Sequence, residues 1–230
     1  SWRRDFKTGH EWPRDHISKL RLVTTEGDVK MPWELSRFHH GVTLALGYAL
    51  TADPRYPREW VSQFDSWRAD NPPERGPNWG NAMEASIRAV NWIAAFAIFA
   101  GATDVGAIHE SPLRTTALLK SLIQHGRFIR AHLEDYWPPN NHLLADLCGL
   151  IWLGLFLRPS DPAGFKNPSG LESQRWLAFG LRGLERQLRE QTLSDGANYE
   201  ASTSYHRFVT EMVSATVAVC DLNGAPVSPF

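Results

Sequence analysis

The chain has 230 residues and a formal net charge of −1, with 24 lysines and arginines against 25 aspartates and glutamates. Like charges never form a run long enough for a basic patch, which argues against nucleic acid or an anionic membrane surface as a partner. No apolar stretch approaches the roughly 20 residues of a membrane span.

Residues 1–32 are polar, with weak strand-like alternation, and are expected to form an extended or irregular segment. They contain no recognisable signal peptide and no initiator methionine, so the sequence is interpreted as an excerpt of a longer protein. Residues 33–230 are expected to form one helical domain that is truncated.

From residue 33 onward apolar residues recur with the helical period. Pro- and Gly-rich loops at 71–80 and 158–170 interrupt this pattern. Helix pairs recur about every 40 to 50 residues, which predicts stacked αα-hairpins and an all-α fold. The predicted helices cover residues 35–51, 55–70, 81–101, 111–132, 141–157, 171–191 and 202–222.

The predicted helix at 81–101 has a polar stripe on one side, formed by Glu84, Arg88, Asn91 and Trp92. A solvated stripe would favour Lys and Glu, so this mixture predicts a side that faces a water-filled cavity. Glu84 and Arg88 also have the spacing of an ion pair within one helix, which is the structural alternative.

The helix at 141–157 is preceded by two prolines and by Asn140, a good N-cap residue. Asn141 and His142 then occupy its first turn. The amides of a first turn lack partners within the helix and the helix dipole is positive there, so this end is suited to bind a carboxylate. The alternative is a capping asparagine beside an incidental histidine.

The last predicted helix has a similar entrance, because Tyr205 and His206 follow the candidate caps Ser202 and Ser204. If the hairpins pack side by side, the two entrances converge on one rim of the array. The alternative for Tyr205 is a structural tyrosine in the core.

An amide, an imidazole and a phenol suit β-elimination from a uronic acid. Neutralising the sugar carboxylate would stabilise the negative charge that develops when the neighbouring proton is removed. An ordinary tyrosine has a pKa of about 10, so a tyrosine base needs a nearby cation or donor. Candidates for that cation are His206, Arg207 and Arg88.

The segments "NNHLLADLCGLIWLGLF" and "DGANYEASTSYHRFVTEM" resemble those of the heparinase II/III-like polysaccharide lyases, a family that includes alginate lyases. The segments "PWELSRFHH", "DPRY" and "NPPERGPNWGNAMEASIRAVNWI" are similar to earlier parts of the same family. The resemblance runs from about Trp33 to Met212, with its motifs in the family's order.

This resemblance implies an incomplete α/α toroid, followed in complete members by a C-terminal β-sandwich domain. It assigns Asn141 and His142 to neutralisation of the uronate carboxylate and Tyr205 to proton transfer. A further catalytic histidine, and zinc where members bind it, come from the β-domain. The resemblance therefore implies that residues 1–230 alone are inactive, and it favours a periplasmic or secreted location.

The expected partner is an acidic polysaccharide, and the expected sugar-binding residues are Arg37, Trp79, Glu84, Arg88, Asn91, Glu200 and His206. The two cysteines, Cys148 and Cys220, offer no metal-ligand spacing, and no cofactor is expected. Two other functions remain open. One is a toroidal glycoside hydrolase that uses carboxylates such as Asp195, Glu200 or Glu84. The other is a polysaccharide-binding protein of an exopolysaccharide pathway, without turnover.

Overall fold

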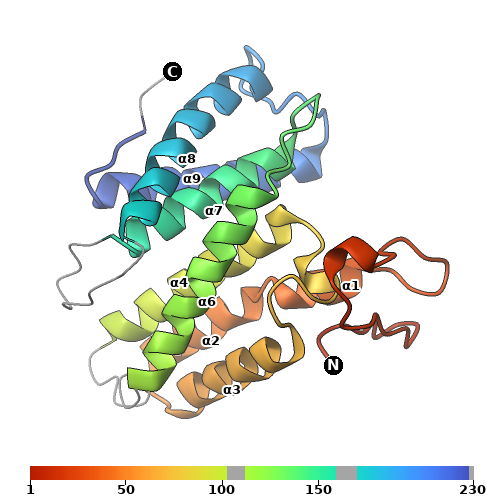
Figure 1. Cartoon of the computed structure of the whole chain (residues 1–230). Helices are drawn as coiled ribbons and strands as arrows, with labels where there is room; N and C mark the ends of the chain where they lie inside the picture. Colours follow the sequence, from red (N-terminus) through yellow and green to blue (C-terminus); the bar gives the residue numbers. More distant parts are fainter. Residues whose placement is uncertain (103–111, 159–169, 228–230) are drawn as a thin grey trace. The chain divides into compact units, whose positions relative to one another are not determined.

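The computed structural model describes residues 1–102, 112–158 and 170–227, with the backbone alone for 112–114. This part of the chain is helical (Figure 1) and contains isolated β-bridges but no β-strand. In chain order the helices are η1 (Ile17–Lys19), α1 (Lys30–Ser36), α2 (His39–Thr51), α3 (Arg55–Asp70), η2 (Pro77–Trp79), α4 (Ala82–Gly101), α6 (Pro112–Ala131), α7 (Asn141–Phe156), α8 (Gly170–Gln191) and α9 (Thr203–Leu222).

Most of the predicted helices are confirmed to within a few residues, but the prediction of one continuous helix over 35–51 is wrong. The structure has α1 and α2 instead, separated at Arg37 and at Phe38, which adopts a left-handed backbone with φ 61°. The Phe38 ring is buried, stacked on Trp2 at 5.2 Å and edge-on to Trp92 at 5.5 Å. Burial of this ring offsets the backbone strain. Ser111 and residues 159–169, where a helix start and a loop were predicted, lie outside the described residues.

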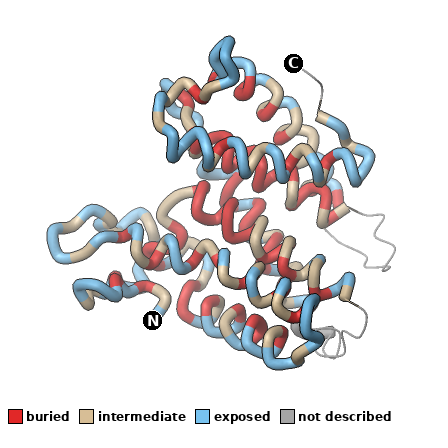
Figure 2. Tube along the Cα trace, turned by 180° about the vertical axis from the view of Figure 1, so that it is seen from behind, coloured by how far each residue is buried: buried red, intermediate tan, exposed pale blue. Residues whose placement is uncertain are grey.

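The chain forms two compact units, Ser1–Gln124 and His125–Phe230, and α6 runs across their boundary. In the first unit α2 packs against α3 and α4. Buried residues lie mainly along helix sides, whereas the connections are largely exposed (Figure 2). Trp67 of α3 meets Trp92 of α4 edge-on at 5.3 Å, and Phe64 meets the same indole at 4.9 Å. Several of the ten tryptophans are therefore core residues, as their apolar faces favour.

In the second unit α7 packs between α8 and α9. Almost every α7 residue is buried, which fits its continuous apolar sequence. Glycines permit the close approach of α8: a Cβ at Gly180 would lie 2.7 Å from Ile151 Cγ1, and one at Gly154 would lie 2.7 Å from Leu177 Cβ. Burial raises the pKa of Cys148 to about 12 and that of Cys220 to about 11, so both thiols stay protonated.

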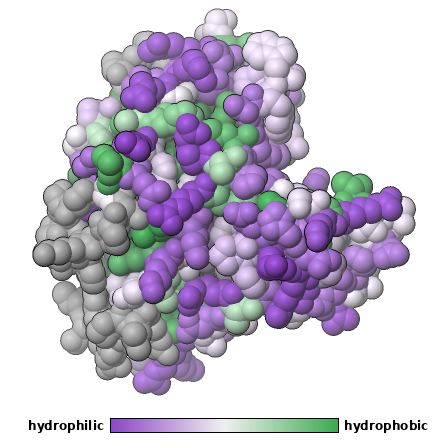
Figure 3. All heavy atoms as spheres, viewed as in Figure 1, coloured by the Kyte–Doolittle hydropathy of each residue, from purple (hydrophilic) through white to green (hydrophobic). Residues whose placement is uncertain are grey.

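Among the described helices, α4 has the length and hydropathy of a membrane span. Within the structure 67% of that stretch is buried, which is the environment of a core helix. On the face drawn in Figure 3, hydrophilic residues predominate and the hydrophobic areas are small and separate.

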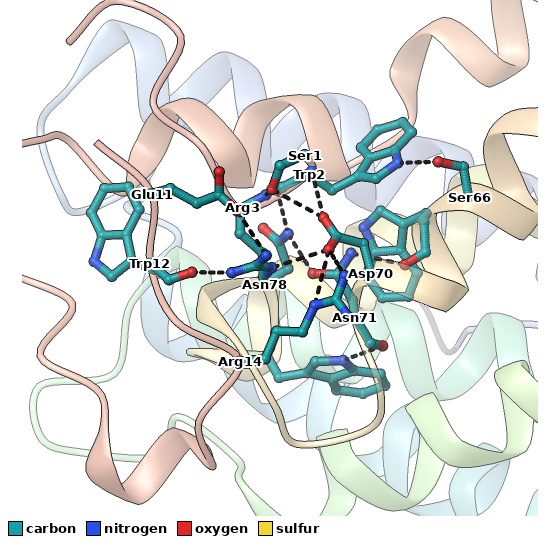
Figure 4. Close-up of polar contacts among 12 residues, drawn as sticks. Ser1, Trp2, Arg3, Glu11, Trp12, Arg14, Ser66, Asp70, Asn71 and Asn78 are labelled. Carbon is teal, nitrogen blue, oxygen red and sulfur yellow. Dashed lines mark hydrogen bonds and ion pairs between the residues drawn. The ribbon is translucent and has the colours of Figure 1, made fainter. Parts of the chain in front are cut away.

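A carboxylate at the end of α3 holds the N-terminal segment of the first unit (Figure 4). Asp70 accepts hydrogen bonds from the Trp2 N–H at 2.7 Å, Arg3 Nε at 3.2 Å and Arg14 Nη2 at 2.5 Å. Burial by itself raises the pKa of Asp70, but the hydrogen bonds from Arg14, the Trp2 backbone and Arg3 outweigh it, so the pKa lies below its usual value. Asp70 therefore anchors residues far from it in sequence.

Replacing Asp70 by asparagine is expected to lower the free energy of unfolding by about 3 kcal/mol, because Arg14 would lose its carboxylate partner and the buried Arg3 would keep only Glu11. Since the folded-state pKa of Asp70 is lowered, this stabilisation is complete above the ordinary value of about 3.9 and is lost as pH falls through the folded-state value. Urea unfolding followed by tryptophan fluorescence measures the change.

The matched control is Asp65→Asn on the same helix. Asp65 is 47% exposed and contacts Arg68 at 3.5 Å, so its loss is expected to cost under about 0.5 kcal/mol. Equal effects of the two substitutions would contradict the anchoring role of Asp70.

Candidate active site

The entrance of α7 is built as its sequence predicts. Asn140 is the N-cap, and its side-chain Oδ1 accepts the backbone N–H of His142 at 2.9 Å. Two prolines precede it and end the previous segment. This cap leaves Asn141 and His142 in the first turn, on the end of the helix with positive partial charge.

Asn141 is only 4% exposed, and its donors are directed at one residue. Its backbone N–H donates to Glu200 Oε1 at 2.6 Å. Its side-chain Nδ2 donates to Glu200 Oε2 at 2.9 Å and Oε1 at 3.1 Å. Glu200, predicted to bind sugar, therefore contacts the residue predicted to neutralise the sugar carboxylate.

His142 pairs with an acidic residue that the sequence reading did not single out. Its Nδ1 lies 2.8 Å from Glu134 Oε1. The Glu134 backbone N–H in turn donates to Asp146 Oδ2 at 2.9 Å. Because a carboxylate only accepts, Nδ1 carries the proton toward Glu134, and this contact orients the ring.

The entrance of α9 presents Tyr205 to solvent. Ser202 is the N-cap and accepts the Tyr205 backbone N–H at 3.4 Å. The tyrosine is 49% exposed. No described residue forms a hydrogen bond with the Tyr205 hydroxyl, so this group is accessible to a ligand.

His206 lies in the same turn but faces the chain that leads into it. Its Nδ1 accepts the backbone N–H of Asn198 at 3.2 Å. Asn198 then accepts the Glu200 backbone N–H through its side chain at 3.0 Å. His206 therefore supports the turn that carries Glu200, and its predicted contact with sugar stays a prediction.

The two helix entrances are joined within the second unit. The bonds from Asn141 to Glu200 connect the first turn of α7 to the segment that leads into α9, 59 residues away in sequence. The two helices also pack against each other. The turn that carries Asn141 and His142 is thus joined to the segment that precedes Tyr205.

The sugar-binding residues predicted in the first unit have different environments. Arg37 makes a bidentate ion pair with Glu84, with Nη2 to Oε1 at 2.7 Å and Nε to Oε2 at 2.9 Å. Asn91 donates from Nδ2 to the Arg37 backbone oxygen at 2.7 Å. Glu84 is thus engaged with the connection between α1 and α2, and only Arg37 and Asn91 of this group retain appreciable exposure.

The prediction that one side of α4 faces a water-filled cavity is wrong. Arg88 is completely buried, with its guanidinium 4.2 Å from the Trp67 ring centre and 5.4 Å from that of Trp79. Its Nη2 donates to the Asn78 backbone oxygen at 3.1 Å. Burial lowers the pKa of Arg88 to about 9. Aromatic rings fill the expected cavity, and neither Arg88 nor Trp79 reaches the surface.

A metal site is not apparent in the part of the chain that the structure describes, where no three histidine, cysteine or acidic side chains cluster suitably. Sequence reasoning missed the pairing of His142 with Glu134 and that of Asn141 with Glu200. The first had a weak signal, an acidic residue shortly before the cap. The second had none, because its partners are distant in sequence.

Solved structures share the fold of this chain. The chain matches the crystal structure of heparinase III with a TM-score of 0.68 and 17% identity, over 90% of this chain and 31% of that one. It matches heparan sulfate lyase HepC from Pedobacter heparinus with a TM-score of 0.65 and 22% identity, over 89% and 30%. The fold is the all-α toroid portion of such proteins, as predicted.

Sequence matches identify the family to which the chain belongs. The chain belongs to the heparinase II/III-like polysaccharide lyases, because the family model described as Heparinase II/III N-terminus matches residues 6–227. A heparin-sulfate lyase of Pedobacter heparinus is 28% identical over 185 residues, and one of Bacteroides stercoris is 22% identical over 218. These matches cover 78% and 86% of this chain but only 25% and 30% of the relatives.

Proposed function

We propose that the complete gene product is a polysaccharide lyase that cleaves a uronic-acid-containing chain by β-elimination. Its relatives are named as heparin-sulfate lyases, so heparan sulfate is the first substrate to test. The observation that carries the proposal is the junction of the Asn141 helix entrance with the segment that leads to Tyr205.

In this proposal Asn141 and His142 interact with the uronate carboxylate. A charged His142, whose ring Glu134 orients through Nδ1, donates its Nε2–H to the sugar carboxylate. As the proton on the carbon next to the carboxylate leaves, negative charge spreads onto the carboxylate oxygens. Donors held in place stabilise this charge more than they stabilise the ground state.

Tyr205 transfers the proton in this proposal. Its exposed position suits a proton donor or base that must contact a bound polysaccharide. Protonation of the leaving glycosidic oxygen completes the elimination: the C–O bond breaks, and its former bonding pair goes to that oxygen. The new double bond forms in the sugar that keeps the carboxylate. The family resemblance adds a histidine from a C-terminal β-domain. Contact of the polymer with Arg37 and Asn91 stays a prediction.

A hydrolase is less well supported, since two of its candidate carboxylates are already engaged. Glu84 is buried in the ion pair with Arg37, and Glu200 is bonded to Asn141. A hydrolase needs one carboxyl to donate a proton and another to activate water or attack. Asp195 is exposed, but neither of the other two is available to act with it.

Incubation of the complete gene product with heparan sulfate tests the proposal. A lyase generates an unsaturated sugar that absorbs in the near ultraviolet, and each cleavage also yields one new reducing end. New reducing ends without that absorbance would identify a hydrolase. Binding without either product would identify a non-catalytic polysaccharide-binding protein, and both results would overturn the proposal.

A further inference from the structure

Glu200 is positioned by a turn just ahead of α9. Its backbone N–H donates to Asn198 Oδ1, and the next residue, Ala201, adopts a left-handed backbone with φ 54°. The Ala201 N–H closes the turn on the Asn198 backbone oxygen at 3.2 Å. The turn directs the Glu200 carboxylate at the α7 entrance, where the helix dipole favours a negative charge.

The Glu200 carboxylate determines how the Asn141 amide is oriented. A carboxylate accepts hydrogen bonds and cannot donate, so the amide must present its NH2 group rather than its oxygen. The two carboxylate oxygens subtend a much smaller angle at Nδ2 than the two amide hydrogens do. A single N–H therefore serves both oxygens, and the second hydrogen points away from Glu200.

Within the described residues, Glu200 is the sole acceptor for the Asn141 side chain. Without this acceptor the amide could rotate and present its oxygen, which would repel a sugar carboxylate. The additional bond from the Asn141 backbone to Glu200 ties the same carboxylate to the helix itself. Orientation and placement of the amide thus depend on one side chain.

We infer that Glu200 is a positioning residue, which fixes the Asn141 amide with one N–H available to the uronate carboxylate and couples the α7 entrance to the segment bearing Tyr205. This inference rests on the proposed lyase function. It replaces the expected contact of Glu200 with sugar by an action through Asn141. Misplacement of a catalytic group by about 1 Å lowers turnover by about 100-fold.

A double-mutant cycle on the complete gene product tests this inference. Glu200→Gln keeps the size of the side chain and one acceptor oxygen but loses the charge. We expect it to lower kcat by about 10- to 100-fold, with KM changed less than about threefold because uniform binding is retained. In an Asn141→Ala background it should change kcat by less than about twofold, because the amide that Glu200 orients is gone and the introduced glutamine can still accept the backbone N–H of residue 141.

Thermal unfolding separates positioning from loss of structure, and Glu211→Gln on the exposed side of α9 is the matched control with unchanged kcat. If Glu200→Gln fails to fold, Glu200→Asp keeps the charge, shortens the reach and should show the same dependence on Asn141. If the kcat losses of Glu200→Gln and Asn141→Ala multiply in the double mutant, this inference is overturned, whereas the proposed function is not. A wild-type protein without unsaturated product would overturn the proposed function, and this inference with it.

Discussion

Replacing Tyr205 by phenylalanine is expected to lower kcat of the complete gene product on its polysaccharide by about a thousandfold, as loss of a general acid–base group does. The change removes one oxygen from a side chain that is 49% exposed. Because that oxygen makes no hydrogen bond to another described residue, the fold should be unaffected. Binding of the polymer, measured by calorimetry, should stay within about twofold because few contacts are lost.

The control for this substitution is Tyr56→Phe, which removes a phenolic hydroxyl from α3 in the first unit. Tyr56 packs against Gly47 through its ring, so loss of the hydroxyl should leave turnover unchanged. Near-normal production of the unsaturated sugar by Tyr205→Phe would remove this residue from the proposed mechanism.

Replacing Asn141 by alanine is expected to lower kcat by about 100- to 1000-fold, the effect of removing one donor from a charge-stabilising site. KM should change little, because the contact with the carboxylate strengthens as charge develops. The backbone N–H of residue 141 still donates to Glu200, so the helix entrance should persist. The stability cost should be about 1 kcal/mol, the value of a typical hydrogen bond.

Asn140→Ala provides the matched comparison one residue earlier. It removes the N-cap bond to the His142 backbone, which should cost about 1 kcal/mol of stability, and should leave kcat nearly unchanged. If Asn141→Ala raises KM while kcat is preserved, Asn141 is a binding residue without a role in charge stabilisation. Equal kinetic losses at 140 and 141 would indicate a general disturbance of the α7 entrance.

The helices that sequence reasoning placed correctly are those whose signals are local. The start of α7 follows from two prolines and a capping asparagine, and its burial follows from an unbroken apolar run. The family resemblance, confirmed by the match over residues 6–227, added the toroid class. The break between α1 and α2 was missed, because Phe38 adopts its unusual backbone to insert a ring among Trp2 and Trp92.

Among the polar residues too, sequence reasoning recognised those with local signals and missed those whose partners are distant in sequence. Asn141, His142 and Tyr205 were recognised from their places in first turns and from family motifs, and their roles stay proposals. The stripe on α4 was assigned to a water-filled cavity because it mixes Glu, Arg, Asn and Trp, whereas a solvated surface favours Lys and Glu. In the structure Arg88 stacks on indole rings and Glu84 pairs with Arg37. A polar side chain can be buried once a partner satisfies it, and here the partners come from other parts of the chain.

The helix content, the cap at Asn140 and the family could be predicted from the sequence, because propensity, capping and motifs act over a few neighbouring residues. For α9 the sequence offered Ser202 and Ser204, and Ser202 is the cap. Which side chains face each other, such as Glu200 with Asn141 and Asp70 with Arg3 and Arg14, depends on how the helices pack. These pairings join residues dozens of positions apart, and they depend on how buried helix faces pack. No local pattern encodes that distance, so the orientation of the proposed catalytic amide could be seen only in the folded chain.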